Sequence, residues 1–253
     1  MSSTVSPTKD IPLLREACLI GGKWVRGDES NSISVNNPAT GAIIGQVPRF
    51  GRTETAEAIN AAHSAFKVWS KMTAVERCNL MLGWADLISK NQKELARLLT
   101  IEMGKPLAES MGEVAITGNY IRFFAEEGKR VYGDVIPSPW KDRRIMVTKE
   151  PLGVVGAITP WNFPSSMLGR KLAAALGSGC TVVAKPASQT PYSALILGEL
   201  AEEAGIPAGV INIITGSAAQ IADEMCENEK VRKITFTGST PVANSLPRKL
   251  WPI

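Results

Sequence analysis

The sequence predicts an α/β protein built on a doubly wound parallel sheet, an incomplete Rossmann-like arrangement that follows an N-terminal β-hairpin and a helical segment. Four short apolar runs predict buried strands, at residues 153–159, 180–185, 210–215 and 233–238. Helical segments lie between them, at residues 165–177, 191–204 and 217–227. Short buried strands separated by helices long enough to cross over are typical of parallel sheets with helices on both faces.

The first half of the chain changes its hydrophobic period once. Residues 18–49 alternate polar and apolar residues around turn signals such as "NPATG", which predicts short strands. The period then becomes helical and predicts four successive helices, at residues 54–69, 74–90, 92–104 and 107–129. Thr73 and Glu76 form a capping box at one helix start, and Gly104 followed by Pro106 is a stop signal.

Composition narrows the classes of partner. The net charge of +4 is spread along the 253 residues, which gives no reason to expect nucleic acid or an anionic membrane as a partner. No apolar run approaches the roughly 18 residues of a membrane span, and the N-terminus lacks a signal-peptide core, so we expect a cytoplasmic protein. Four widely spaced cysteines and one histidine predict no metal site.

Four loops leave the predicted carboxyl ends of the strands, which is where open α/β sheets bind ligands. These loops are residues 159–164, 185–191, 215–220 and 236–240. No G-x-G-x-x-G motif follows a strand, so the common dinucleotide fingerprint is absent. The position of the loops still favours a nucleotide-binding sheet.

The chemistry-bearing residues of these loops each allow two interpretations. Lys185 could reach ribose or phosphate groups, or it could simply extend its ammonium to solvent. Gly238 and Ser239 could present backbone N–H groups to a pyrophosphate, or Ser239 could be an ordinary helix N-cap. Asn162, between two prolines, could offer a fixed amide to a developing oxyanion, or it could be a turn residue.

A joint match of several motifs resembles the aldehyde dehydrogenase superfamily. The motifs are "ITPWNFP", "AAALGSGCTVVAKPASQTP", "LAEEAGIPAGVINIITG" and "VRKITFTGST". Further segments, including "IEMGKPLAE" and "FFAEEGKRVYGD", are most similar to the bacterial succinate-semialdehyde dehydrogenases. The likeness runs from about Leu13 to Val242.

The resemblance implies that a cysteine thiolate attacks an aldehyde, that hydride passes to NAD(P) and that a glutamate activates water. It implies that Asn162 donates its amide to the oxyanion and that Arg170 meets the distal carboxylate of the substrate, with Gly169 standing where relatives have Thr. The implied cofactor site comprises Trp161, Asn162, Lys185, Pro186, Ala187, Ser188, Gly238 and Ser239. Ser188 beside Lys185 tolerates a 2′-phosphate, so NADP is the favoured cofactor and NAD remains possible.

Relatives continue past this region into an "ELGG" motif that bears the glutamate and a "GQ-x-C" motif that bears the cysteine, and neither occurs here. We therefore expect a truncated relative that is inactive alone. The resemblance divides the chain into hairpin and helices of the cofactor domain (1–129), crossing strands like an oligomerisation segment (130–150), the dinucleotide-binding core (151–242) and an aberrant tail (243–253). A complete relative is expected to be a homo-oligomer acting on a small aldehyde.

Three interpretations of function stay open at this point. The chain could derive from an oxidoreductase for succinate semialdehyde, or for a related compound such as glutarate semialdehyde. It could instead be a non-catalytic module that binds NADP. A remnant that folds poorly is the third, because lost strands would expose sheet edge and apolar surface.

Overall fold

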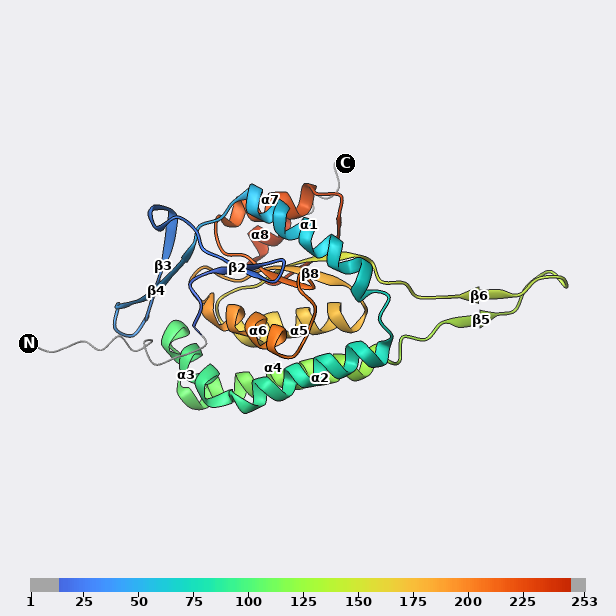
Figure 1. Cartoon of the computed structure of the whole chain (residues 1–253), viewed down its shortest axis with the longest axis horizontal. Coiled ribbons are helices and arrows are strands. Elements are labelled where there is room, and N and C mark those ends of the chain that lie inside the picture. The colour runs from blue at the N-terminus through green and yellow to red at the C-terminus, as the bar shows by residue number, and fades with distance from the viewer. Residues whose placement is uncertain (1–13, 247–253) are drawn as a thin grey trace, which may run out of the picture.

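The computed structural model describes residues 14–246, and a six-stranded sheet forms its centre (Figure 1). The order of the strands across the sheet is β10-β7-β8-β9-β1-β2. Four of them are parallel, β7 (Val154–Ile158), β8 (Thr181–Lys185), β9 (Ile211–Ile213) and β10 (Val231–Phe236). The parallel core predicted from the apolar runs is confirmed, with each strand inside its predicted range or within two residues of it.

The remaining two strands make the sheet mixed, which the sequence pattern did not predict. Strand β1 (Cys18–Ile20) pairs antiparallel with both β9 and β2 (Lys23–Val25). All three residues of β1 are buried, because the strand is covered on both faces. A second hairpin, β3 (Ser32–Asn36) with β4 (Ile43–Pro48), forms a separate two-stranded sheet. The 3₁₀ turn η1 (Glu29–Asn31) connects the two hairpins.

Helices cover both faces of the sheet, as a doubly wound fold requires (Figure 1). One face carries α1 (Arg52–Trp69) and α7 (Ala218–Glu227), and the other carries α5 (Pro164–Gly177) and α6 (Tyr192–Glu203). A further layer of α2 (Ala74–Lys90), α3 (Gln92–Met103) and α4 (Leu107–Gly128) packs on the outside of α5 and α6. The capping box of Thr73 and Glu76 at the start of α2 is present.

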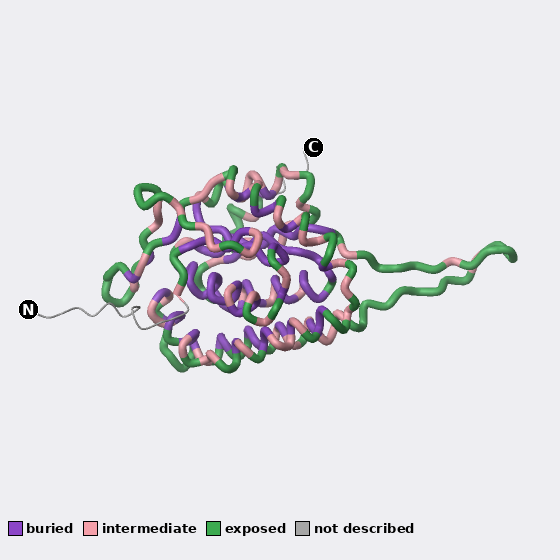
Figure 2. The backbone as a smooth tube through the Cα atoms, in the orientation of Figure 1, coloured by how far each residue is buried: buried purple, intermediate pink, exposed green. Residues whose placement is uncertain are grey.

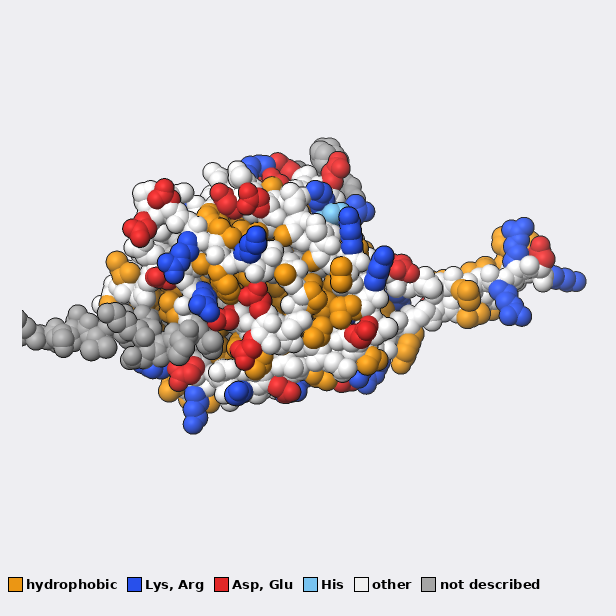
Figure 3. Space-filling model, in the orientation of Figure 1, with side chains coloured by type: hydrophobic (Ala, Val, Ile, Leu, Met, Phe, Trp, Pro, Cys, Tyr) orange, Lys and Arg blue, Asp and Glu red, His pale blue; other side chains and the backbone are white. Residues whose placement is uncertain are grey.

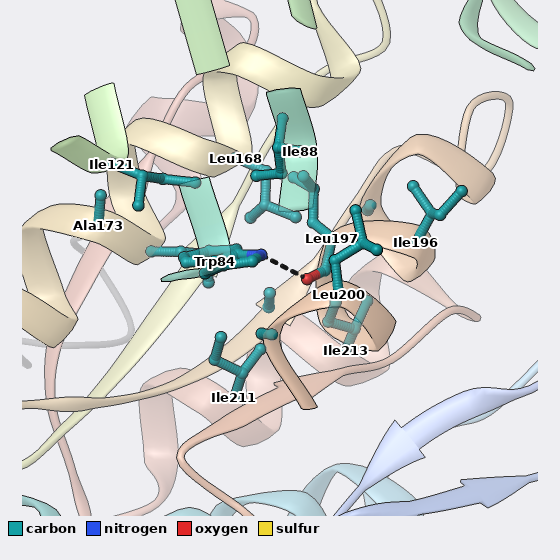
Figure 4. Packing of buried hydrophobic residues seen from close by; sticks show 14 of the residues in the cluster. Trp84, Ile88, Ile121, Leu168, Ala173, Ile196, Leu197, Leu200, Ile211 and Ile213 are labelled. Carbon is teal, nitrogen blue, oxygen red and sulfur yellow. Dashed lines mark hydrogen bonds between the residues drawn. The ribbon is translucent and has the colours of Figure 1, made fainter. Parts of the chain in front are cut away.

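The buried residues follow the sheet and the helices packed on both of its faces (Figure 2). Trp84 of α2 is completely buried among aliphatic side chains from α4, α5, α6 and β9 (Figure 4). Its indole N–H donates to the carbonyl of Leu197 in α6 at 3.0 Å. The outer helix layer is therefore joined to the sandwich by both apolar contact and a satisfied buried polar group.

Helices α4 and α5 approach each other closely through small residues. A Cβ atom added to Gly177 would lie 2.5 Å from the carbonyl oxygen of Phe124, which only glycine avoids. At Gly169 an added Cβ would lie 2.6 Å from the methyl group of Thr117. The glycine that replaces a family threonine is thus matched by a side chain from α4. This contact keeps α5, and with it Arg170, in close register with α4.

Residues 130–150 form an arm that projects from the body of the molecule (Figures 1 and 2). Its strands β5 (Asp134–Ile136) and β6 (Ile145–Val147) pair antiparallel and are almost entirely exposed, including Val135 and Met146. Lys and Arg side chains gather near its tip (Figure 3). The strands are confirmed, and a role of this arm in oligomerisation stays a prediction.

The described chain ends in a short helix, α8 (Thr240–Ser245), that follows β10. This helix includes the first three residues of the predicted aberrant tail, and residues 247–253 of that tail lie outside the described residues. Within residues 14–246, no helix is both long enough and apolar enough to cross a membrane.

Candidate functional site

The loops after β7, β8 and β10 lie side by side where the parallel strands have their carboxyl ends. We call this side of the sheet its carboxyl edge. The parallel register places Ile158 opposite Lys185, and Thr159 donates its backbone N–H to the Lys185 carbonyl at 3.2 Å. On the other side of β7, Phe236 pairs with Ile158, so that the turn at 237–239 flanks the same loop. The carboxyl ends of these three strands therefore bring the predicted site loops together.

Lys185 is a buried lysine that has no carboxylate partner within the described chain. Its side chain is nearly fully buried, and its Nζ donates one hydrogen bond of 2.9 Å to the backbone carbonyl of Pro186. Burial lowers the pKa of Lys185 from 10.5 to about 8. A buried ammonium group is unfavourable unless hydrogen bonds or an opposite charge compensate it. This position suits an anionic or hydroxyl-rich ligand.

Two buried hydroxyl groups on the same loops also lack partners. The Oγ1 atoms of Thr159 and Thr190 make no hydrogen bond to any residue that the structure describes, although both residues are buried. Buried hydroxyls in native proteins are normally satisfied. Together with Lys185 they provide unused donors and acceptors at this edge, so the residues present fit a nucleotide cofactor.

A cavity of about 620 Å³ lies beside these loops. Strand β3, the end of α3 and the loops after β7 and β8 form its walls, and Trp161, Ser188 and Thr190 are among its lining residues. Trp161 is 52% exposed, so its indole surface is available to a ligand. The cavity thus joins two residues of the implied cofactor site to one of the unpartnered hydroxyls. Pro186 and Ala187 are buried in the loop that leads to Ser188.

Asn162 is exposed, and its side-chain amide makes no hydrogen bond to the part of the chain that the structure describes. Its backbone is held, because the Nζ of Lys105 donates to the Asn162 carbonyl at 3.1 Å. The same ammonium lies 2.6 Å from the Oε2 of Glu113. The amide of Asn162 is therefore presented to solvent on a backbone that is fixed from the protein interior.

Helix N-termini at this edge differ in how they are capped. Glu113 accepts the first backbone N–H groups of α5, and Glu102 accepts those of α6. A carboxylate already satisfies the positive end of each of these helices. The α8 start at Gly238 and Ser239 is exposed, and Ser239 makes no side-chain cap. Both residues therefore keep the accessibility that the sequence interpretation required.

Arg170 lies away from these residues, six positions along α5. It lines a separate, mostly apolar cavity of about 550 Å³ together with Lys171. Its Nη2 contacts the thioether of Met167 at 2.8 Å, and Lys171 donates to the Oγ1 of Thr235 at 2.9 Å. Burial, and then the charge of Arg170, lowers the pKa of Lys171 to about 8. The structure does not bring Arg170 into the cavity that Trp161 and Ser188 share.

Comparison with known proteins identifies a family that matches most of this chain. The profile of the aldehyde dehydrogenase family matches residues 24–250. The chain belongs to the aldehyde dehydrogenase family. The match extends past Val242, the residue at which the sequence likeness was expected to end. The expected aldehyde dehydrogenase-like fold is confirmed.

Several curated relatives are named as semialdehyde dehydrogenases. This aldehyde dehydrogenase chain is 55% identical over 238 residues to glutarate-semialdehyde dehydrogenase of Pseudomonas aeruginosa, covering 94% of this chain and 49% of the relative. It is 50% identical over 237 residues to the NADP-dependent succinate-semialdehyde dehydrogenase GabD of Escherichia coli, covering 94% and 49%. A crystal structure of an Escherichia coli NADP-dependent enzyme superposes with a TM-score of 0.94 at 49% identity, covering 96% of this chain and 50% of that one. The chain spans about half the length of the curated relatives it matches.

Three of the four cysteines of this aldehyde dehydrogenase chain have a thiol pKa that burial raises. Cys18, Cys78 and Cys180 are buried, and Cys226 is half-buried on α7. Burial raises the pKa of Cys18 to about 11 and also raises the pKa of Cys78 and of Cys226. Since the thiolate is the nucleophile, these environments oppose reactivity. Cys180 precedes the amino end of β8, opposite the carboxyl ends of the strands where the site loops lie.

The sequence interpretation missed Glu102, Lys105 and Glu113. Lys105 was taken only as part of a Gly-Lys-Pro stop signal, and that stop is real, since Gly104 caps α3 with a φ of 89°. A possible signal was the placement of both glutamates on helix faces that otherwise bury apolar or small residues. Charged residues are seldom fully buried unless they are paired or hydrogen-bonded, so such placement points to a buried partner.

We predict that Glu102 makes the stability of the chain pH-dependent. Burial raises its pKa from 4.5 to about 7, although N–H groups of Tyr192 and Ser193 partly oppose that rise. Because the native state then binds a proton that the unfolded state has released, stability should fall as pH rises from about 4.5 to about 7, by roughly 3 kcal/mol. Urea denaturation between pH 4.5 and 8 measures this loss.

Glu102→Gln should flatten that pH dependence. It should also lower stability, because a glutamine offers one oxygen where the carboxyl group of Glu102 offers two to the backbone N–H groups of Tyr192 and Ser193. Glu109→Gln, a change at an exposed glutamate of α4, is the matched control. Parallel curves for the wild type and Glu102→Gln would show that Glu102 does not titrate in this window.

Proposed function

We propose that this chain is the nucleotide-binding portion of an aldehyde dehydrogenase that oxidises a semialdehyde bearing a distal carboxylate, with NADP as the favoured cofactor. The observation that supports it best is the buried, unpaired ammonium of Lys185 beside two unpartnered hydroxyls at the carboxyl edge of a parallel sheet. NAD(P) accepts hydride in this family. Every other contribution below comes from the residues of this chain.

The loop after β8 would hold the ribose end of the cofactor. Lys185 would donate from its ammonium to ribose hydroxyls or to a 2′-phosphate, and Ser188 would add a neutral hydroxyl in the adjoining cavity. Trp161 would provide an apolar wall, and the exposed N–H groups of Gly238 and Ser239 would face the pyrophosphate. Pro186 and Ala187 would keep the loop backbone close to the ligand.

The choice of NADP over NAD rests on charge. A carboxylate at position 188 would accept bonds from both ribose hydroxyls and would repel a 2′-phosphate, whereas Ser188 does neither. Among the described residues that line the same cavity, Glu102 is the one with a carboxyl group, and its oxygens are occupied by backbone N–H groups of α6. The Escherichia coli relative GabD is named as an NADP enzyme, which agrees with this preference.

Asn162 and Arg170 would act on the substrate. The free amide of Asn162 can donate to an oxyanion that develops on the aldehyde oxygen, because its backbone is fixed in advance. Arg170 has no carboxylate partner within the described residues and lines a separate, mostly apolar cavity with Lys171, so its contact with the distal carboxylate of the substrate rests on the family resemblance. Relatives named for succinate and glutarate semialdehyde, both ω-carboxylates, support this substrate class, and we favour succinate semialdehyde.

We predict that the chain binds NADP through Lys185 and Ser188. Lys185→Ala should weaken binding at least about tenfold, because a hydrogen bond to a charged group contributes roughly 1.5–3 kcal/mol. Ser188→Glu should weaken NADP binding while retaining NAD binding. Calorimetric titration of both nucleotides measures these effects, with the exposed Lys93→Ala as the matched control. Unchanged NADP affinity in both variants would remove the cofactor assignment.

We further predict that the chain alone oxidises no aldehyde, because burial raises the pKa of Cys18, Cys78 and Cys226, and Cys180 lies at the amino end of β8. Absorbance of NADPH should stay flat with NADP and succinate semialdehyde, beside Escherichia coli GabD as the positive control. A fusion of residues 1–242 to the second half of the Pseudomonas aeruginosa relative should restore activity, and Arg170→Ala in that fusion should erase the preference for ω-carboxylates. Turnover by the chain alone that is lost on changing one of its cysteines would overturn the prediction.

A further inference from the structure

The corner between α3 and α4 places three buried charged side chains within twelve residues of each other in sequence. Glu102 lies in the last turn of α3, Lys105 in the connecting turn, and Glu113 in the second turn of α4. Each is less than a tenth exposed. Burial of three ionisable groups is costly unless ion pairs and hydrogen bonds compensate it, so each of them should have a specific partner.

Both glutamates bind the N-terminus of a helix that follows a site loop. The Oε1 of Glu113 accepts the backbone N–H groups of Ser165 at 2.9 Å and Ser166 at 3.1 Å, in the first turn of α5. Glu102 accepts those of Tyr192 and Ser193 in the first turn of α6, each at 2.8 Å. One corner of the outer helix layer thus fixes where both site loops, 159–164 and 186–191, enter their helices.

Lys105 adds contacts that no helix cap requires. Its Nζ lies 2.6 Å from the Oε2 of Glu113, donates to the Asn162 carbonyl at 3.1 Å, and sits 3.9 Å from the centroid of the Phe163 ring. The ion pair and the cap use different oxygens of Glu113, so the cap does not depend on the lysine. What Lys105 holds is the peptide group and the ring next to the Asn162 side chain.

We propose that Lys105 is a positioning residue that sets the direction in which the backbone projects the Asn162 side chain. The carbonyl of Asn162, the ring of Phe163 and the first N–H groups of α5 are held at three successive points by the one Lys105–Glu113 pair. The Cα–Cβ bond of Asn162 then has little freedom, while its amide stays exposed and unbonded. A catalytic role for Asn162 rests on the proposed function. The effect of Lys105 on the direction of its side chain depends only on the contacts of Lys105 and Glu113.

The alternative is that the ion pair serves stability alone. Buried ion pairs can often be replaced by uncharged residues of similar shape with little loss of stability. The double variant Lys105→Met/Glu113→Gln separates the two roles, because the glutamine oxygen can occupy the position of Oε1 and keep both N–H bonds of α5. This variant removes the contact to the Asn162 carbonyl and leaves no unpaired buried charge.

The experiment measures ¹⁵N order parameters of the backbone amides of Trp161, Asn162 and Phe163 and of the Asn162 side-chain NH₂ group. We expect about 0.85 for the wild-type backbone and less than about 0.6 in the double variant, with the amides of residues 186–188 unchanged. The control is Lys93→Met/Glu109→Gln, which makes the same chemical changes at exposed positions of α3 and α4. Lys105→Arg, which keeps the charge and a donor, should retain most of the order.

Equal ¹⁵N order parameters at residues 161–163 in the wild type and in the folded double variant would overturn the proposal. If the variant does not fold, the wild type still decides the matter. The Lys105 ε-methylene protons should be shifted upfield by the Phe163 ring and its ammonium protons slowed in exchange, and random-coil shifts with fast exchange would contradict the proposal. These readouts need no nucleotide, so the two proposals can fail separately. If the double variant loses loop order but the wild type does not bind NADP, the proposed function is contradicted and the positioning role of Lys105 is not.

Discussion

The parallel pairing of β7 with β8 is the contact on which the arrangement of the site depends. Its register places Ile158 opposite Lys185, so the loop bearing Asn162 and the loop bearing Ser188 leave the sheet at the same level. Pairing of β10 on the far side of β7 brings the turn at Gly238 to that edge as well. A shift of two residues in any of these pairings would keep the core pattern and separate the loops, so register matters more here than strand content.

Charge at this edge is divided between groups that are internally satisfied and groups that are not. Glu102 and Glu113 are both occupied by helix N-termini, and Lys105 balances Glu113. Lys185, by contrast, has no carboxylate partner in the described chain, and its ammonium donates to the backbone carbonyl of Pro186. A buried group without a partner calls for an explanation, and a buried titratable group with a shifted pKa beside a cavity is a candidate for ligand binding. Lys105, which is paired with Glu113, therefore fits a positioning role, whereas Lys185, which has no carboxylate partner, fits ligand binding.

Local pattern predicted most elements because each has a clear hydrophobic period and clear end signals. The helix at residues 74–90 was predicted to the residue, since a capping box begins it and its apolar face is regular. The antiparallel addition of β1 to β9 was missed, because a three-residue buried strand carries no information about a partner, here Ile213, far along the chain. The role of Lys105 was missed for the same reason, since its partner Asn162 lies 57 residues away. The site loops could be predicted because position after a strand is a local property.

The most direct test of ligand binding at this edge is the titration of Lys185 itself. Selective ¹³C labelling of the lysine ε-carbons, with Lys185→Met to assign the signal, reports its pKa in the absence and presence of NADP. We expect a pKa of about 8 for the free chain, because burial disfavours the ammonium form. Saturating NADP should raise that pKa towards its ordinary value, because phosphate charge and ribose oxygens favour the ammonium. An identical titration curve with and without the nucleotide would contradict nucleotide binding at Lys185.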